Sequence, residues 1–95
     1  MQATRIGDVC TGHDLCPPRP LVEGSPNVLI NGEPAGRVGD LYVAHGCFFH
    51  PPHTGVIASG SSKVFINGRP AGRVGDPVSC GSTVAQGSSN VIVGG

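Results

Sequence analysis

Three metal-binding side chains follow three Gly-Asp pairs at nearly the same distance along the chain. His13 and His45 each lie five residues after the Asp of such a pair, and Cys80 lies four residues after a third Asp. Imidazole nitrogen and thiolate sulfur are ligands that Zn²⁺ takes in structural sites. If the three segments are equivalent in space, the spacing predicts that these side chains converge at one end of the molecule.

Further candidate ligands lie in His50-Pro51-Pro52-His53. Two consecutive prolines favour polyproline II, which repeats every three residues, so both His side chains should project from the same side. Three His and one Cys complete a tetrahedral site with no free position, which is typical of a structural zinc. Such a site supplies on the order of 10–16 kcal/mol of apparent binding free energy. The residues leave open whether His50 or His53 is the fourth ligand.

The remaining cysteines offer a competing interpretation. Cys10, His13 and Cys16 form a local Cys-x2-His-x2-Cys cluster that could chelate a metal or form a disulfide. A reducing cytoplasm disfavours the disulfide. Cys10, Cys16 and Cys47 have no counterparts at the equivalent repeat positions, so we interpret them as small filler residues or reactive thiols.

A thiol enzyme is the alternative class of function. Cys80 or Cys47 with one of the histidines could act as nucleophile and base. However, four Cys and four His among 95 residues bring some such pair together by chance. No oxyanion-hole or nucleophile-elbow motif accompanies them. We therefore expect the protein not to be an enzyme.

Glycine and proline dominate the elements that must position these residues. The chain has 16 Gly and 9 Pro, and residues 61–67 are the longest stretch free of both. An average helix needs about 11 residues, so the composition excludes a helical protein. Six Lys and Arg balance six Asp and Glu, and this charge predicts neither nucleic-acid nor membrane-surface binding. Residues 1–8 lack the apolar run of a secretory signal, which predicts synthesis and folding in the cytoplasm.

An internal repeat gives the glycines and prolines a pattern. Residues 24–40 match residues 60–76 at thirteen of seventeen positions, and a partial third copy begins at residue 87. Residues 3–8 have the pattern of the missing half, Ala-Gly-Arg-Val-Gly-Asp. Asn-Gly in each complete copy predicts a hairpin, and the Pro two residues later should occupy an edge or the first residue of the return strand. The sequence thus predicts that the two chain ends together form a third hairpin.

Three hairpins in a ring predict an all-β fold for a single domain, residues 1–95. We expect a small cone with pseudo-threefold symmetry, stapled by a metal near its tip. Three nearly equal faces suit docking on the blunt end of a three-chain β-helix, which strand edges would extend. Apolar residues with period two in the equivalent strands would face the core and, in part, the base. They are Val28, Ile30, Val64, Ile66, Val91 and Val93.

Several ordered motifs resemble one known family. Pro34-Ala35-Gly36-Arg37 and Pro70-Ala71-Gly72-Arg73 are similar to a Pro-Ala-Ala-Arg motif with Gly in its third position, a replacement conservative in size. The flanking Gly-Ser-Pro-Asn-Val-Leu-Ile-Asn-Gly, Gly-Asp-Leu-Tyr-Val-Ala-His, His-Pro-Pro-His and Val-Ser-Cys-Gly-Ser segments are similar as well. Over essentially its whole length, the chain resembles the PAAR-repeat spike-tip proteins.

The resemblance implies a metal site and its ligands. Family members bind zinc near the tip through three His and one Cys. Cys80 and His45 match the family motif directly, and His13 follows the first Gly-Asp as expected. The last ligand falls in the His-Pro-Pro-His segment, where His53 is favoured because it directly precedes Thr-Gly-Val-Ile; His50 is the alternative.

The resemblance also implies a function. A PAAR-repeat cone caps the VgrG trimer of the type VI secretion system, one cone per three chains, and sharpens it for membrane piercing and effector delivery. The implied partners are the VgrG-type trimer, effectors and, transiently, a target-cell membrane. The protein would stay in the cytoplasm until it is assembled on the spike and then be delivered outside or into a target cell. A phage tail spike tip and a free-standing zinc-binding adaptor are the alternatives.

Overall fold

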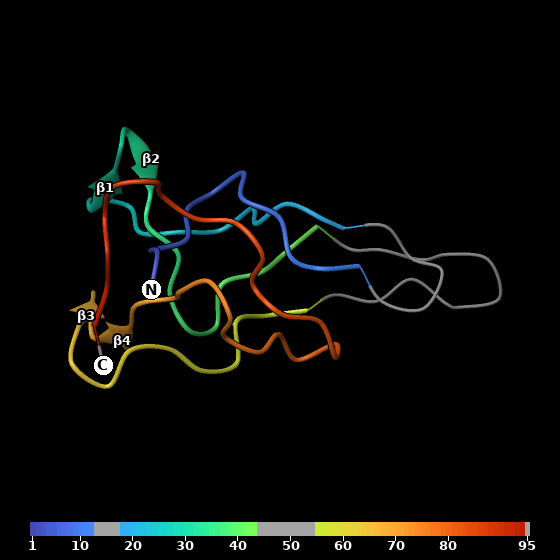
Figure 1. Ribbon diagram of the computed structural model, residues 1–95. Helices are drawn as coiled ribbons and strands as arrows, with labels where there is room; N and C mark the ends of the chain where they lie inside the picture. Colours follow the sequence, from blue (N-terminus) through green and yellow to red (C-terminus); the bar gives the residue numbers. More distant parts are fainter. Residues whose placement is uncertain (13–17, 44–54, 95) are drawn as a thin grey trace, which may run out of the picture.

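Two short antiparallel hairpins form where the complete repeats carry Asn-Gly (Figure 1). The computed structural model describes residues 1–12, 18–43 and 55–94. Strand β1 (Leu29–Ile30) pairs with β2 (Glu33–Pro34), and β3 (Phe65–Ile66) pairs with β4 (Arg69–Pro70). The described residues contain no helix, and hence none long and apolar enough to cross a membrane. The prediction of an all-β fold is confirmed.

The turns of both hairpins have the predicted conformation. Asn31 and Gly32 have φ angles of 55° and 83°, and Asn67 and Gly68 have φ angles of 54° and 79°. Positive φ at both central residues is the signature of a type I′ turn, whose twist matches that of the strands it joins. The Asn-Gly pairs therefore set the hairpin register, in which Leu29 lies opposite Pro34.

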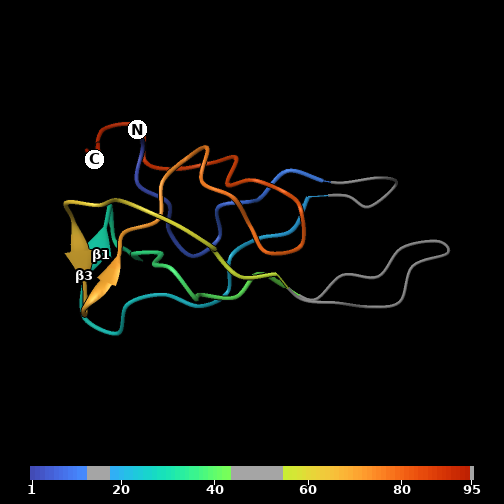
Figure 2. The same ribbon diagram turned by 90° about the horizontal axis from the view of Figure 1, so that it is seen from below.

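The third hairpin is built from the two ends of the chain, as predicted. Gln2 pairs with Ile92 in the antiparallel sense. The Ala3 amide donates to the Val91 carbonyl at 3.0 Å, and the Val93 amide donates to the Met1 carbonyl at 2.7 Å. Figure 2 shows the N-terminal and C-terminal segments beside each other at the end of the molecule that carries β1 and β3. The ends thus complete the partial third copy of the repeat.

The three units join in a closed ring. In each unit, the Arg of the repeated motif pairs with the Ala of the next unit around the ring. The pairs are Arg5 with Ala35, Arg37 with Ala71, and Arg73 with Ala3. Since the third pair returns to the first unit, the ring closes and gives the molecule its pseudo-threefold axis.

A triangle of backbone hydrogen bonds surrounds the axis. The Gly36 amide donates to the Thr4 carbonyl at 2.9 Å, the Gly72 amide to the Gly36 carbonyl at 2.9 Å, and the Thr4 amide to the Gly72 carbonyl at 3.1 Å. A Cβ on Gly36 would lie 2.8 Å from Thr4 Cγ2, and one on Gly72 would lie 3.0 Å from the same atom. The Thr4 side chain already fills this space, so packing requires Gly in the third motif position at 36 and 72. It is not the neutral replacement that its size suggests.

The triangle lies between two clusters of buried residues. The cluster at the hairpin end consists of Ala3, Ile30, Ala35, Ile66, Ala71 and Val93. The cluster toward the opposite end consists of Cys10, Leu21, Tyr42, Ile57, Val78 and Val84. Each cluster takes equivalent residues from all three units, so neither forms until the ring has closed.

Candidate functional site

A tight turn ends each repeated motif and begins the segment in which a ligand is predicted. In the Arg-x-Gly-Asp sequence of each unit, the Asp amide donates to the Arg carbonyl at 3.0 Å. The third residue is Gly7, Gly39 or Gly75, with φ between 93° and 97°. A type II turn requires positive φ at this position, which Gly adopts without strain. All three segments therefore leave the ring in the same way.

An ion pair holds each of these turns closed. Arg37 donates from Nε to Asp40 Oδ2 and from Nη2 to Asp40 Oδ1, both at 2.9 Å, and its backbone amide donates to Oδ2 at 2.8 Å. The Arg37 and Asp40 side chains are 9% and 2% exposed. The hydrogen bond with Asp40 raises the pKa of Arg37 above its usual value, against the opposing effect of burial. Arg5 with Asp8 and Arg73 with Asp76 repeat this geometry.

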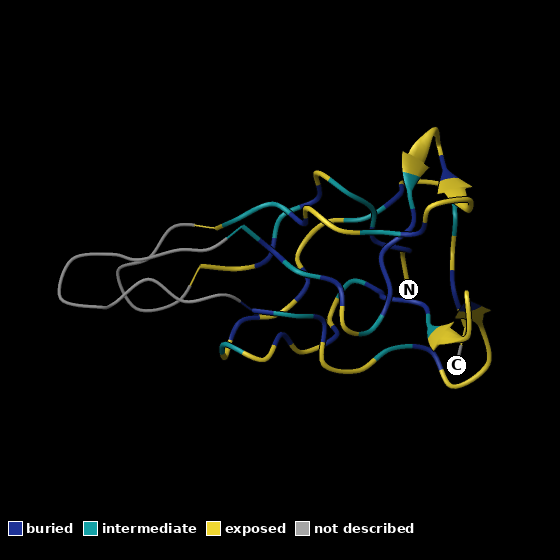
Figure 3. Cartoon of the chain, turned by 180° about the vertical axis from the view of Figure 1, so that it is seen from behind, coloured by how far each residue is buried: buried dark blue, intermediate teal, exposed yellow. Residues whose placement is uncertain are grey.

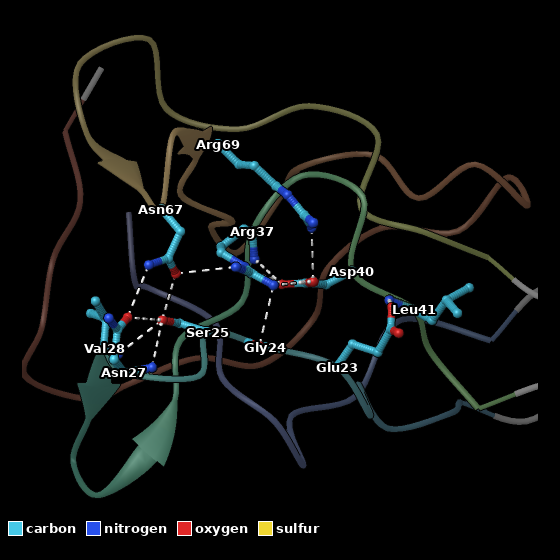
Figure 4. A network of polar contacts seen from close by, with 10 residues as sticks. All are labelled: Glu23, Gly24, Ser25, Asn27, Val28, Arg37, Asp40, Leu41, Asn67 and Arg69. Carbon is cyan, nitrogen blue, oxygen red and sulfur yellow. Dashed lines mark hydrogen bonds and ion pairs between the residues drawn. The ribbon is translucent and has the colours of Figure 1, made fainter.

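A polar network joins neighbouring hairpins around the ring (Figure 4). Ser25 Oγ accepts hydrogen bonds from the amides of Asn27 and Val28 and donates to Asn67 Oδ1 at 2.6 Å. Arg37 Nη1 donates to the same Asn67 oxygen at 3.1 Å. The equivalent Asn31 oxygen accepts from Ser88 Oγ and from Arg5 Nη1. Each turn Asn therefore ties its own hairpin to the Ser and Arg of an adjoining unit.

Cys80 lies at the centre of a short loop opposite the hairpins. Pro77 pairs with Thr83, and the Val78 amide donates to the Ser82 carbonyl at 2.8 Å. Gly81 has φ of 98°, and its amide donates back to the Val78 carbonyl. A turn followed by a left-handed Gly is a usual three-residue hairpin connection. The sulfur of Cys80 thus projects from a fixed backbone.

The chain that follows the His-Pro-Pro-His segment packs directly against this sulfur. A Cβ on Gly55 would lie 2.8 Å from Cys80 Sγ, so only Gly permits this approach. The first described residue after the predicted fourth-ligand segment therefore lies beside Cys80.

Much of the chain at the hairpin end is exposed (Figure 3), and each unit contributes one exposed apolar residue there. Leu29, Phe65 and Ile92 occupy equivalent positions and are 59%, 56% and 63% exposed. Side chains alternate across a strand, and Ile30, the neighbour of Leu29 in β1, packs in the core. Leu29 and its two equivalents therefore face away from the core. We call this surface, formed by Leu29, Phe65 and Ile92, the apolar base.

The backbone of the apolar base has hydrogen-bonding groups that point away from their own hairpins. The Ala35 amide donates to the Val28 carbonyl at 2.9 Å, so Leu29 and Pro34 form a non-hydrogen-bonded pair. The amide and carbonyl of Leu29 consequently point away from β2. Ala71 with Val64 and Ala3 with Val91 repeat this bond around Phe65 and Ile92.

The sequence matches a known family twice, over residues 1–51 and over residues 49–95, and the description of that family is PAAR motif. The chain belongs to the PAAR motif family. PAAR motif proteins are spike-tip proteins of contractile injection systems, and the family is structural rather than enzymatic. No match was found among curated individual proteins.

The predicted metal ligands of this PAAR chain are only partly within the described residues. Cys80 is described, whereas His13, His45, His50 and His53 lie outside the described residues, and the ligand set stays a prediction. Within residues 1–12, 18–43 and 55–94, no three His, Cys, Asp or Glu side chains group as they would around a metal.

The described ends of the His-bearing segments nevertheless lie on the Cys80 side. The Thr11 amide, two residues before His13, donates to the carbonyl of Thr83 at 2.7 Å. The Tyr42 amide, three residues before His45, donates to the Gly55 carbonyl at 2.9 Å. Gly55 itself contacts the Cys80 loop.

The other cysteines and one buried tyrosine complete this end of the molecule. Cys10 is buried in the cluster below the Cys80 loop, which agrees with its interpretation as a small filler residue. Cys16 and Cys47 lie outside the described residues. Burial raises the pKa of Tyr42 well above its usual value.

Sequence reasoning missed two features of the PAAR framework. The first is the set of Arg–Asp ion pairs, although Arg-x-Gly-Asp occurs three times and signals a Gly-dependent turn. The second is the apolar base. The alternating apolar pattern predicts that Val28 and Ile30 face the core or the base, whereas the base is formed by Leu29, which lies between them, and by its equivalents. Of the named residues, Ile30, Ile66 and Val93 enter the core, as expected. The signal for the base is that the middle position is apolar in all three copies, as Leu29, Phe65 and Ile92.

Proposed function

We propose that this PAAR protein is the tip of a type VI secretion spike, seated through its apolar base on the blunt end of a VgrG-type trimer. The observation that carries the proposal is the closed ring, which presents equivalent side chains three times around one axis. A partner with three identical chains can match such a surface, whereas a partner without threefold symmetry would leave part of it uncovered.

Docking would combine strand pairing with apolar burial. The outward-pointing amide and carbonyl of Leu29, Phe65 and Ile92 can extend three strands of a β-helical partner, one per chain. Unpaired strand edges on a free protein promote aggregation, so a lasting partner also protects them. Three half-exposed side chains would lose most of their contact with water at the same time.

The proposal includes one structural zinc held by His13, His45, His53 and Cys80, with His50 as the alternative to His53. Cys80 fits this role because its loop fixes the sulfur beside Gly55 while leaving the side chain half-buried. When bound, zinc would supply a crosslink between the segments that leave the ring. Cys80 and the histidines would bind it and hold these segments together at the tip.

A rigid tip needs no catalytic residues for this role. We infer that the protein assembles on the spike in the cytoplasm, is driven outward by the contractile sheath, and meets a target membrane only transiently. Effectors would travel with the spike. A phage tail spike would use the same tip and base with another trimer, and a free-standing zinc adaptor would bind metal without a trimer.

Co-purification with the candidate trimer tests the proposal. We expect one tip per three spike chains, and loss of the complex when Leu29 and Phe65 are both replaced by Asp. Val22→Asp is the matched control, because Val22 is also about half exposed but lies outside the apolar base. Equal binding by the double variant and the control would contradict docking through the base. Zinc binding without any complex with a VgrG-type or phage trimer would favour the adaptor.

A further inference from the structure

The loop that carries Cys80 places a buried hydroxyl beside its sulfur. Ser82 Oγ lies 3.3 Å from Cys80 Sγ, within the distance of a hydrogen bond to sulfur. Ser82 is only 4% exposed. Among the described residues, Cys80 Sγ is the partner that the structure gives to this hydroxyl. A buried hydroxyl without a partner costs free energy, so the sulfur and the hydroxyl satisfy each other.

The backbone fixes this contact. The Ser82 carbonyl accepts from Val78, and Gly81 at φ of 98° turns the chain so that Ser82 returns beneath Cys80. With the backbone held at both Val78 and Ser82, the hydroxyl reaches the sulfur by rotation about a single side-chain bond.

Ser79, on the other side of Cys80, serves a different purpose. Its Oγ accepts a hydrogen bond from the Val56 amide at 3.0 Å, which ties the loop to the neighbouring segment. Ser79 is exposed, whereas Ser82 is buried. The loop thus contains two serines within two residues of the cysteine, and only Ser82 contacts the sulfur.

We propose that Ser82 is a positioning residue for the Cys80 sulfur at the metal site, a role that rests on the proposed zinc binding. A metal-bound thiolate has no hydrogen to donate, so the Ser82 hydroxyl must be the donor in this contact. The hydrogen bond orients the sulfur toward the metal position and offsets part of its negative charge. Loss of such an outer partner typically weakens metal binding by about 10–100-fold.

Metal titrations of the full chain test this role. Wild type, Ser82→Ala, Ser82→Thr and Ser79→Ala are stripped of metal and titrated with Zn²⁺ against a competing chelator. We expect Ser82→Ala to bind zinc about 10–100-fold more weakly. Ser82→Thr keeps the hydroxyl and should recover most of the affinity, and Ser79→Ala should stay near wild type. Thermal melting of the metal-free variants checks that all four fold alike.

A spectroscopic readout separates this role from a purely structural one. Co²⁺ replaces Zn²⁺ in the same four proteins, and the thiolate-to-cobalt charge-transfer band reports the electron density on the sulfur. We expect the band to shift in Ser82→Ala alone. Unchanged zinc affinity with an unshifted band in Ser82→Ala would overturn the inference. Failure of the proposed zinc site is a separate outcome, in which wild type binds no metal or Cys80→Ser retains the thiolate band.

Discussion

The hairpin end and the Cys80 end of the molecule use the repeat in opposite ways. At the hairpin end, the units contact one another through the same types of Ser, Asn and Arg residue. At the other end, the segments after each Asp differ in length and sequence, and the third one turns back within ten residues, at Pro77 to Gln86. Residues that hold units together are repeated, whereas residues that would serve one shared metal occur once each.

The repeat also has an exception at the hairpin end itself. Gly94 occupies the position of Asn31 and Asn67, and Ser61 Oγ donates to its backbone carbonyl at 2.5 Å instead of to a side-chain amide. The third hairpin therefore keeps the Ser contact but lacks the Asn oxygen that Arg5 and Arg37 use. The three units are therefore equivalent in the backbone hydrogen bonds of the ring, whereas the side-chain contacts of the third hairpin differ from those of the other two.

Metal removal should give the largest difference between the two ends. Chelation, or Cys80→Ser, should lower the melting temperature by roughly 10–20 °C. Zinc at about 100–1,000 times its Kd stabilises the fold by about 3–4 kcal/mol, and each kcal/mol shifts the melting temperature of a domain of this size by several degrees. Hydrogen exchange should accelerate at Tyr42 and Val78, whereas the Ala35 and Gly36 amides should remain protected. Equal acceleration at both ends would show that the metal does not act locally.

Breaking a buried ion pair should have the next largest effect. Asp76→Asn leaves the buried Arg73 charge without its partner and should cost about 3–5 kcal/mol in the free energy of unfolding. Asp8→Asn should cost less, because Arg5 is 21% exposed and water can replace part of the lost interaction. Urea denaturation of both variants measures the difference. Equal costs would mean that burial does not govern these pairs.

Adding a methyl group at the axis should destabilise the protein less than breaking an ion pair, and a second substitution should partly reverse the effect. Gly36→Ala places a methyl group within 2.8 Å of Thr4 Cγ2 and 2.7 Å of Leu21 Cδ2, which should cost about 1–3 kcal/mol. Thr4→Ala removes the first of these contacts, so the double variant should be more stable than the two single effects predict. Strict additivity in this double-mutant cycle would contradict a shared space at the axis.

The Asn contacts should give the smallest measurable effect. Asn67→Gly keeps a residue that adopts the positive φ of this turn, removes the acceptor of Ser25 and Arg37, and should cost about 1–2 kcal/mol. Gly94→Ala is the matched control in the third unit, where a Cβ would meet no atom within 4 Å, and should change stability by less than about 0.5 kcal/mol. The difference between their thermal midpoints measures how far the amide supports the hairpin end.

The framework was largely predictable because its signals are local and repeated. Asn31-Gly32 and Asn67-Gly68 determine their turns, and the split third copy predicts that residues 3–8 meet residues 87–93. The role of Thr4 was not predictable, because its contacts with Gly36 and Gly72 arise only when three distant segments meet.

The candidate site was predictable in part, through spacing. Counting from each Gly-Asp pair led to Cys80, and the structure places that residue in a loop beside Gly55. The contribution of Ser82 could not be read in advance, because both Ser79 and Ser82 lie within two residues of Cys80. The conformation of Gly81 decides which of them reaches the sulfur.

The joining of the two chain ends has a consequence for how the protein is made. The pair between Gln2 and Ile92 closes a loop of nearly the whole chain, and contacts of such large sequence separation slow folding. During synthesis, the first two hairpins can form as they emerge from the ribosome. Residues 1–3, however, can pair only after the segment that ends at Val93 has been synthesised. Until then the ring stays open and its strand edges remain unpaired, which favours aggregation of the incomplete fold.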